Sequence, residues 1–461
     1  MDNIANAVFC INQKNIPIFY DKSTEKLSLF FGSEFITIPE KLDMIVSKKL
    51  GLLTNGNILY RVSIPLSNDS LLVCNGNPIR AANGTQIRDV EYYIENYEPD
   101  TLYSEMRLQF LELECFAPSR NRAVFGNQIV FFKETESLYS FQINYKGTNV
   151  SVSFDTRIEA DAKYRTTATT ISELVIKFPE THDINYLIEL YVRTRNFFSF
   201  VCNRQNIGLR NATLIGTYVC KGLDDNNQIV DETVRTKQTI NFSQKYLEPL
   251  EETKKAQKVL NMRYFTNHLD NLFQLFFEKD NDASALVNSS SIHHSFKYRN
   301  LIDLEQSLHI TATFEYYTRT LLPEISSQST IDFIEDMKNL VDQYIDGAKG
   351  KKKTKAKNFK KTLKPQISLE EKIIKAYNGY SNWSPLSAIL LEFFGDDISE
   401  LAKTANEWRN ELAHEKRTYQ PDVNVIYAMR LVEHLNYCIV LRCAGYTDEE
   451  IKSIISEILV K

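Results

Sequence analysis

The hydrophobic period of the sequence changes at about residue 246, and this change constrains the fold more than any other feature. Before this point, short apolar runs are separated by turn residues, a pattern typical of strands. After it, apolar residues recur three and four positions apart, as in amphipathic helices. The chain has 461 residues, enough for two or three domains. We therefore predict an α+β fold, with a β-rich N-terminal domain over residues 1–245 and an all-α domain over residues 246–461.

The first half contains short apolar runs that we predict to be strands. The clearest are FITIP, ILYRVSIPL, MRLQFLELECF, QIVFFKE, ATLIGTYV and TKQTINF. Turn signals separate them, among them NGN at residues 55–57 and 75–77, and NGT and KGT further on. Asn-Gly pairs tolerate the positive φ of tight hairpins. One helix is predicted within this half, over residues 183–201, with apolar positions at Leu187, Leu190, Tyr191 and Phe198.

The second half is predicted to be a series of helices. Their ranges are 246–279, 298–321, 330–347, 367–377, 396–415, 421–443 and 447–460. Residues at their ends are suited to helix termini: Thr447 and Glu450 form a capping-box pattern, Pro421 suits a first helical position and Gly445 suits a C-terminal stop.

Composition excludes several classes of protein. The formal net charge of −5 argues against a surface that coats nucleic acid throughout, although a local basic patch remains possible. Seven scattered cysteines form no disulfide framework, so we expect a reducing, cytoplasmic environment. The N-terminus has no signal-peptide pattern, and no run approaches 18 apolar residues, so we expect no membrane span.

Arg409, Asn410 and His414 lie within six positions of one another in EWRNELAHEK. An Arg followed five residues later by a His is expected about 0.3 times by chance in this composition, and a second pair, Arg263 and His268, has the same spacing. Requiring Asn directly after Arg lowers the chance expectation to about 0.02, and only residues 409–414 meet this criterion. We interpret Arg263 and His268 as a pair on a helix surface.

Helix geometry predicts where the motif points. The apolar residues Ile398, Leu401, Ala405, Trp408 and Leu412 recur at the spacing of a core-facing stripe. At about 100° per residue, the motif's Asn and His lie about 40° apart and roughly opposite the end of that stripe. The motif is therefore expected to face solvent or a second subunit, with a merely solvated helix face as the alternative.

With the long apolar helix that follows it (VIYAMRLVEHLNYCIVL), this motif resembles the HEPN domain of higher eukaryotes and prokaryotes. The resemblance covers roughly residues 250–461. The first half, with its YLIELYVRTRNFFSFVCNRQNI segment, is similar to the N-terminal region of ApeA-type phage-defence proteins. The resemblance implies a metal-independent endoribonuclease whose site lies at a dimer interface, with Arg409, Asn410 and His414 as catalytic residues.

The residue types fit this chemistry. A His can exchange protons near neutral pH, and an Arg can stabilise charge that grows on a phosphorane. HEPN domains often carry an acidic or polar residue on an earlier helix, and Glu315 is our candidate in this sequence. The alternative is a structural ion pair with Arg319, four residues further on.

A lysine-rich run, AKGKKKTKAKNFKKTLK, lies between two predicted helices and holds nine Lys from Lys349 to Lys364. Blocks of like charge are usually disordered and solvated, but this one could instead bind RNA phosphates. A nuclear-localisation role is a further alternative. The candidate RNA-binding residues are Lys351, Lys352, Lys353, Lys355, Lys357, Lys360 and Lys361.

Other candidates are weaker. His293 and His294 lie in a Ser-rich loop without metal-ligand spacing, and Cys438 and Cys443 suit apolar positions in a buried helix. We predict no cofactor and no metal.

The sequence therefore predicts an RNA-cleaving effector of anti-phage abortive infection, with RNA (tRNA among the candidates) as partner and a phage-derived trigger for the N-terminal domain. The alternative is a catalytically silent HEPN module that binds RNA, nucleotide or a partner, or acts as a scaffold. Because acid–base cleavage needs two proton-transfer groups, we expect at least a homodimer. The apolar helix from Val425 to Leu441 is expected to contribute to its interface.

Overall fold

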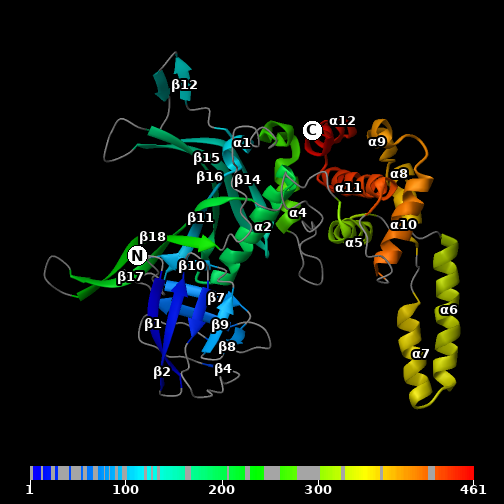
Figure 1. Cartoon of the computed structure of the whole chain (residues 1–461), viewed down its shortest axis with the longest axis horizontal. Helices are drawn as coiled ribbons and strands as arrows, with labels where there is room; N and C mark the ends of the chain where they lie inside the picture. Colours follow the sequence, from blue (N-terminus) through cyan, green and yellow to red (C-terminus); the bar gives the residue numbers. More distant parts are fainter. Residues whose placement is uncertain are drawn as a thin grey trace. The chain divides into compact units, whose positions relative to one another are not determined.

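The fold is described from a computed structural model of the chain (Figure 1). For the first 100 residues and for residues 119–134, only the backbone of the strands named below is described. The other described ranges are 101–118, 135–160, 168–204, 207–223, 229–242, 260–277, 302–322, 328–363, 367–413 and 421–460.

The chain divides into two compact units. Unit 1 comprises residues Met1–Val192 and Asn206–Gln257, and unit 2 comprises Arg193–Gln205 and Lys258–Lys461. Unit 1 is built from β-strands and unit 2 from helices, which confirms the predicted α+β class.

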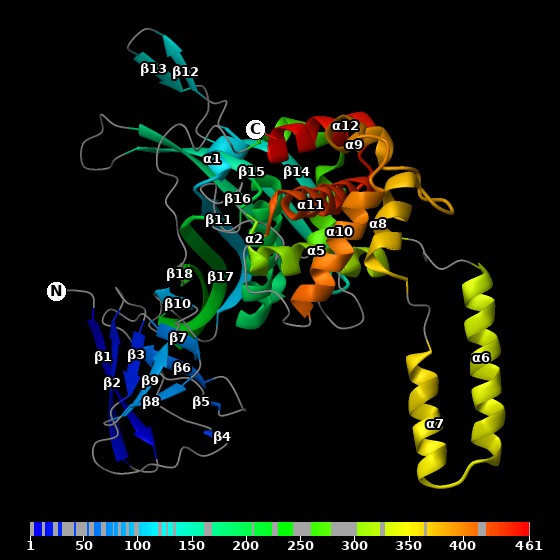
Figure 2. The ribbon, with the colours of Figure 1, turned by 45° about the vertical axis from the view of Figure 1, so that its right-hand side comes forward.

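Unit 1 contains a nine-stranded antiparallel sheet with the order β14-β15-β16-β11-β17-β18-β10-β7-β6 (Figures 1 and 2). The bounds are β6 (Tyr60–Pro65), β7 (Leu71–Gly76), β10 (Tyr92–Glu95), β11 (Leu102–Phe110), β14 (Thr135–Tyr145), β15 (Thr148–Ala160), β16 (Ala168–Thr181), β17 (Leu209–Leu223) and β18 (Ile229–Phe242). Alternation along β11 separates the faces: Met106, Leu108 and Phe110 are buried on the apolar one.

Further short strands complete unit 1. A five-stranded sheet has the order β1-β2-β3-β9-β8, and two two-stranded ladders pair β12 with β13 and β4 with β5. The bounds are β1 (Ile4–Ile11), β2 (Lys14–Asp21), β3 (Lys26–Leu29), β4 (Lys41–Leu42), β5 (Leu53–Thr54), β8 (Pro78–Ala81), β9 (Gly84–Arg88), β12 (Arg122–Phe125) and β13 (Gln128–Phe131). Most predicted strands are confirmed; FITIP lies outside the described residues.

The turn signals had different outcomes. KGT forms the tight β14–β15 hairpin, in which Tyr145 pairs with Thr148 and the two loop residues, Lys146 and Gly147, have φ of 52° and 78°. Positive φ at both loop positions is what a type I′ turn requires. The second NGN, in contrast, makes no hairpin, because β7 and β8 on either side of it belong to different sheets. The first NGN lies outside the described residues.

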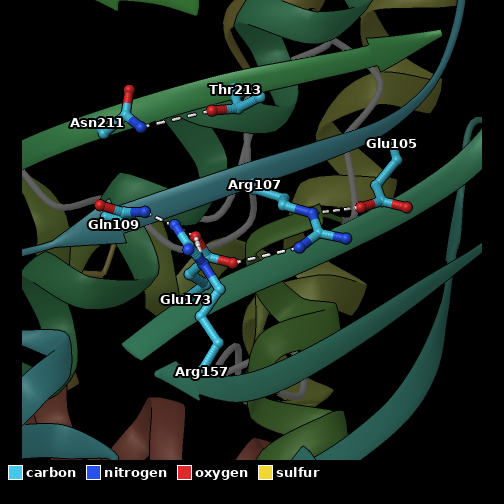
Figure 3. Close-up of polar contacts among 7 residues, drawn as sticks. All are labelled: Glu105, Arg107, Gln109, Arg157, Glu173, Asn211 and Thr213. Carbon is cyan, nitrogen blue, oxygen red and sulfur yellow. Dashed lines mark hydrogen bonds and ion pairs between the residues drawn. The ribbon is translucent and has the colours of Figure 1, made fainter. Parts of the chain in front are cut away.

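A buried carboxylate, Glu173, organises the polar face of the nine-stranded sheet (Figure 3). It accepts hydrogen bonds from Gln109 Nε2 at 2.6 Å and from Arg157 Nε at 2.9 Å, and it lies 3.4 Å from Arg107 Nη1. The Arg107 Nε also donates to Glu105 at 2.5 Å. A buried charge is tolerated when it is paired in this way, so these groups stabilise one another across β11, β15 and β16.

The predicted helix over 183–201 is confirmed as α2 (Ile184–Cys202), whose residues Leu187, Leu190 and Tyr191 are buried. The boundary between the units falls inside it, after Val192. In unit 1, the Tyr191 ring stacks on Phe110 at 6.3 Å.

The second half of α2 packs within unit 2. There the ring of Phe197 lies 4.7 Å from that of Phe273, and Phe200 stacks on Tyr437 at 4.6 Å. The Tyr437 hydroxyl donates to Asn203 Oδ1 at 2.9 Å. Residues 193–205 are therefore part of the helical core.

Unit 2 is built around α11 (Val423–Cys443), in which every residue from Leu431 to Leu441 is buried. The other helices of this unit are α4 (Leu269–Phe277), α5 (Leu304–Thr320), α6 (Gln328–Gly347), α7 (Lys351–Thr362), α8 (Leu369–Asn378), α9 (Ser387–Phe394), α10 (Ser399–Ala413) and α12 (Asp448–Ile455). The α12 helix starts with the predicted capping box of Thr447 and Glu450, and Gly445 before it has a φ of +101°.

Several predicted elements need correction. Within 246–279, two short 3₁₀ turns, η1 (Met262–Tyr264) and η2 (Thr266–His268), precede the short α4, and the His268 ring packs against Tyr446. The end of MRLQFLELECF forms a short helix, α1 (Leu113–Phe116), and α9 was not predicted. The N-cap of α11 is Asp422, whose carboxylate accepts from the Val425 amide, so Pro421 precedes the helix.

The lysine-rich run forms a helix. Instead of a solvated loop, α7 pairs with α6 as an antiparallel hairpin, and an ion pair joins Lys360 to Asp342 (Figure 2). Seven of its twelve residues are Lys.

The described cysteines, Cys115, Cys202, Cys220, Cys438 and Cys443, all have free thiols. Cys438 is buried as predicted, while Cys443 is half-buried, with its pKa raised to about 11 by burial. Among the described helices, none is both long and apolar enough to cross a bilayer.

We predict that Glu173→Ala lowers the free energy of unfolding of unit 1 by about 2 kcal/mol, because it removes a buried acceptor shared by one amide and two guanidinium groups. The measurement is the midpoint of thermal or urea unfolding followed by circular dichroism. Glu114→Ala is the matched control: its ion pair with Arg210 is exposed, so its loss should cost less than about 1 kcal/mol. Equal effects of the two variants would contradict this account of the sheet.

Candidate active site

The helix α10 carries the Arg-Asn-x3-His motif at its C-terminal end. Ile398, Ala402, Ala405 and Trp408 are buried, so one side of the helix belongs to the core. Leu401 and Leu412, which were predicted to lie in this stripe, are half-buried, and Ala402 lies in the core instead. The buried face thus follows the helical period with a small rotation from the predicted one.

The start of α10 is held by Asp397. Its Oδ1 accepts from the Ser399 amide at 2.9 Å, and hydrogen bonds from Ser399 hold the pKa of this carboxyl below its usual value. The negative charge of this carboxylate also interacts favourably with the positive N-terminal end of the helix dipole.

Arg409 forms an ion pair with Glu315. Its Nη2 donates to both carboxylate oxygens of Glu315, at 3.0 and 3.3 Å, which joins α10 to α5. The two side chains are 35% and 29% exposed, so the pair lies at the edge of the core, open to solvent. Residues 94 positions apart in the sequence therefore meet in one polar contact.

Asn410 is exposed and adjoins this pair. Its Oδ1 accepts from Arg409 Nη1 at 3.2 Å. Asn410 therefore points away from the buried Trp408, as the helical angles predict. Arg409 thus contacts Glu315 with one terminal nitrogen and Asn410 with the other.

His414 lies outside the described residues, directly after Ala413, the last residue of α10. His293 and His294 also lie outside them. The polar cluster that the structure describes at the motif therefore consists of Glu315, Arg409 and Asn410.

Glu315 contacts the Arg of the motif and not the Arg of its own helix. A structural pair with Arg319 was the alternative, but the guanidinium of Arg319 lies over the Tyr316 ring at 5.6 Å, and the carboxylate of Glu315 contacts Arg409 instead. The earlier helix therefore supplies an acid to the motif's own Arg.

The second Arg-x4-His pair makes a different set of contacts. Arg263 is exposed with its guanidinium over the Tyr264 ring at 5.1 Å, and the His268 ring packs edge-on against Tyr446 at 5.2 Å. Both side chains contact aromatic neighbours, which agrees with a structural role.

A further polar cluster on α11 was not predicted. Arg430 forms an ion pair with the buried Glu433 at 2.5 Å, and His434 contacts the Arg430 carbonyl through Nδ1 at 2.7 Å. The His434 ring lies 5.0 Å from that of Phe394. The i, i+3, i+4 spacing of these residues was a visible signal, but their burial indicates that they stabilise the core.

The exposed apolar surface of α11 is smaller than the one predicted for an interface. Its apolar residues from Leu431 to Leu441 are all covered by the chain itself, because the neighbouring helices pack around it. Only its first turns expose large apolar groups, Val423 at 80% and Tyr427 at 48%. In the sequence, these turns follow residues 414–420, which include His414 and lie outside the described residues.

The family of the helical region follows from a comparison with known proteins. The family model described as Apea-like HEPN matches residues 308–450. Residues 308–450 are an Apea-like HEPN domain. The match begins in α5, ahead of Glu315, and extends past the motif, so both partners of the ion pair lie in the domain. No curated protein and no solved structure matches the chain.

This match supports a HEPN-type family of defence and ribonuclease proteins. The charge of Arg409 is held at the protein surface by Glu315, an acid on another helix. In the described part of the chain, no three His, Cys, Asp or Glu side chains converge as metal ligands.

We predict that the Glu315–Arg409 ion pair contributes little to stability. In a double-mutant cycle of Glu315→Ala and Arg409→Ala, the coupling free energy should be about 0.2–1 kcal/mol, because both groups are about one-third exposed. The measurement is urea unfolding of the four proteins. A coupling of several kcal/mol would instead make the pair a structural element.

Proposed function

We propose that this protein is a metal-independent endoribonuclease that acts in anti-phage abortive infection. The observation that carries the proposal is the contact of Arg409 with Glu315 and Asn410 at the end of α10, immediately before His414, in an Apea-like HEPN domain. In this proposal residues 246–461 form the nuclease domain. Residues 1–245 form a sensing or regulatory domain that responds to a phage-derived trigger.

The proposed reaction is attack by the RNA 2′-hydroxyl on the adjacent phosphate. A base removes the 2′-hydroxyl proton, the oxygen bonds to phosphorus, and the bond from phosphorus to the 5′-oxygen breaks as an acid protonates that oxygen. The products are a 2′,3′-cyclic phosphate and a 5′-hydroxyl. His414 is proposed as the proton-transfer group, since an imidazole has an unperturbed pKa of about 6.5.

Arg409 is proposed to stabilise the charge on the phosphorane. A guanidinium has five N–H donors, and three contacts to Glu315 and Asn410 leave two for a phosphate. The ion pair with Glu315 holds the guanidinium in place before substrate binds, so little ordering remains to be done in the transition state. Glu315 is therefore proposed as a positioning residue, and Asn410 as a group that orients His414 or the phosphate.

A homodimer is proposed because one motif supplies a single imidazole. Acid and base must act on opposite sides of the phosphorus, and an isologous interface brings the same patch of two chains together. The exposed Val423 and Tyr427 on the first turns of α11 support such an interface, because large apolar groups at a surface mark contact sites.

A catalytically silent HEPN module remains the second candidate. It would bind RNA, nucleotide or a partner with the same surface, or act as a scaffold. The Glu315–Arg409 contact is compatible with it, because a guanidinium held this way can also bind a phosphate without cleaving it. Cleavage and binding assays on the same variants separate the two.

We predict that Arg409→Ala and His414→Ala each reduce RNA cleavage by at least about 100-fold, because each removes a group that acts in the transition state. The measurement is cleavage of total RNA or tRNA in EDTA, with sequencing of the ends and scoring of growth on expression. The matched control is Arg263→Ala, from the second Arg-x4-His pair, which should cleave as the wild type does.

Two results would contradict this prediction. Cleavage that disappears on chelation and returns with a divalent metal would overturn the metal-independent mechanism. RNA binding without cleavage by the wild-type chain would favour the silent module.

We predict that activity requires the dimer. Specific activity should fall faster than linearly on dilution below the dimer dissociation constant, and Val423→Glu should shift the mass measured in solution toward the monomer. An excess of His414→Ala subunits should suppress wild-type activity beyond simple dilution. A stable monomer that cleaves RNA at the full rate would refute the shared site.

A further inference from the structure

The α6–α7 hairpin carries large apolar side chains that are more than half exposed. Phe333, Leu340 and Tyr344 of α6 are 61%, 57% and 57% exposed, and Phe359 of α7 is 52% exposed. In the whole hairpin, among its described side chains, only Ile345 is buried. Exposed apolar groups gathered in this way mark a binding surface.

Three of these side chains, Leu340, Tyr344 and Phe359, line one groove together with lysines. Leu340 and Tyr344 of α6 face Lys352, Lys355 and Phe359 of α7 across a hollow of about 460 Å³. On α7, Lys352, Lys355 and Phe359 are spaced three and four apart, and Ala356 also lines the hollow, so the groove residues lie on one side of the helix.

The groove continues toward the turn of the hairpin. A second hollow of about 650 Å³ is lined by Tyr344 and Lys352 again, with the addition of Lys349. The described residues that line the two hollows include three Lys and no Asp or Glu. The groove is therefore cationic along its length, with two aromatic rings in its walls.

The acidic residues of the hairpin lie elsewhere. Asp332, Glu335, Asp336 and Asp346 are exposed on α6, and Asp342 is used by its ion pair with Lys360. None of these carboxylates is among the residues that line the two hollows. An occupant with negative charge at short intervals and flat apolar groups would complement the groove.

We propose that this groove binds single-stranded RNA. Nucleobases that are free of a duplex stack on Tyr344 and Phe359, while Lys349, Lys352 and Lys355 contact the phosphates between them. Aromatic platforms combined with a basic track are how proteins bind single strands without strong sequence preference. The inference rests on the proposed function in taking RNA as the substrate, and it adds the structural class of that RNA.

The proposal divides the lysines of α7 into two groups. Lys352 and Lys355 line the groove, whereas Lys357 and Lys361 are exposed and do not, and Lys360 is paired with Asp342. Lys352 and Lys355 carry the same charge on the same helix as Lys357 and Lys361. A double variant of the first two can therefore be compared directly with a double variant of the last two.

The first experiment measures binding to a short unstructured oligoribonucleotide by fluorescence anisotropy over a range of salt. The full chain carries His414→Ala, so that the probe stays intact. Lys352→Gln/Lys355→Gln should reduce the log–log salt slope by about 1.4, at about 0.7 per lost phosphate contact, and Lys357→Gln/Lys361→Gln should change it much less. Equal changes from both double variants would overturn the groove as the site.

The second experiment separates base stacking from other apolar contacts. Tyr344→Leu and Phe359→Leu keep apolar area but remove the ring, so each should weaken single-strand binding by at least about fivefold. Tyr344→Phe should bind as the parent does, and duplex RNA should show no such difference. Unchanged binding by both Leu variants would refute the proposal.

The solution mass of each variant provides the remaining outcome. If the Leu variants dissociate a dimer and leave RNA affinity unchanged, the hairpin is an interface between two copies of the chain and the proposal is wrong. Failure of the proposed function is distinguishable: a chain that binds single strands as described but never cleaves RNA removes the nuclease and leaves the groove. If the wild type cleaves RNA but the groove variants bind single strands as well as the parent does, the groove proposal is wrong and the nuclease remains.

Discussion

The burial of α11 is the constraint on which the helical unit depends. Every residue from Leu431 to Leu441 is covered, including polar ones, so helices must pack on all sides of it. Two of its buried polar side chains donate to other segments: Asn436 Nδ2 to the Ile310 carbonyl of α5 at 3.1 Å, and the Tyr437 hydroxyl to Asn203 after α2. Because α5 and α10 both pack on α11, their relative position is determined by this core.

The polar contact of the motif is a consequence of that packing. Glu315 and Arg409 extend from the edges of two helices whose inner faces are occupied by the core, and they meet where the surface begins. A pair that is about one-third exposed adds little stability, but it keeps a guanidinium oriented. The same arrangement suits binding of a phosphate at the end of α10.

The hairpin of α6 and α7 differs from the rest of unit 2 in how few of its side chains are buried. Its helices are joined by the Lys360–Asp342 ion pair, and they leave large apolar side chains at the surface. A helix with seven Lys in twelve residues suffers like-charge repulsion that its acidic partner helix reduces. This explains why the run is helical here although its composition alone suggests a solvated loop.

The sequence by itself determined the change from strands to helices, the burial of one face of α10, the capping box of α12 and the tight KGT turn. Each is set by local spacing or by the φ preference of one or two residues, and such signals are readable without knowing what lies nearby. Glu315 was also identifiable as a candidate, but the sequence left open whether its partner was Arg319 on its own helix or the motif. Local patterns cannot choose between partners that are both within reach of a flexible side chain.

Only the tertiary structure decided which strands share a sheet, where α2 passes from one unit to the other, and which lysines of α7 face Tyr344 and Phe359. The second NGN looked like a hairpin but joins strands of two sheets, because pairing depends on the whole sheet and not on the turn. Similarly, Lys352 and Lys357 are equivalent in composition, and only packing against α6 places the first in a groove and the second outside it. Contacts between distant segments depend on the path of the chain, which no short stretch of sequence contains.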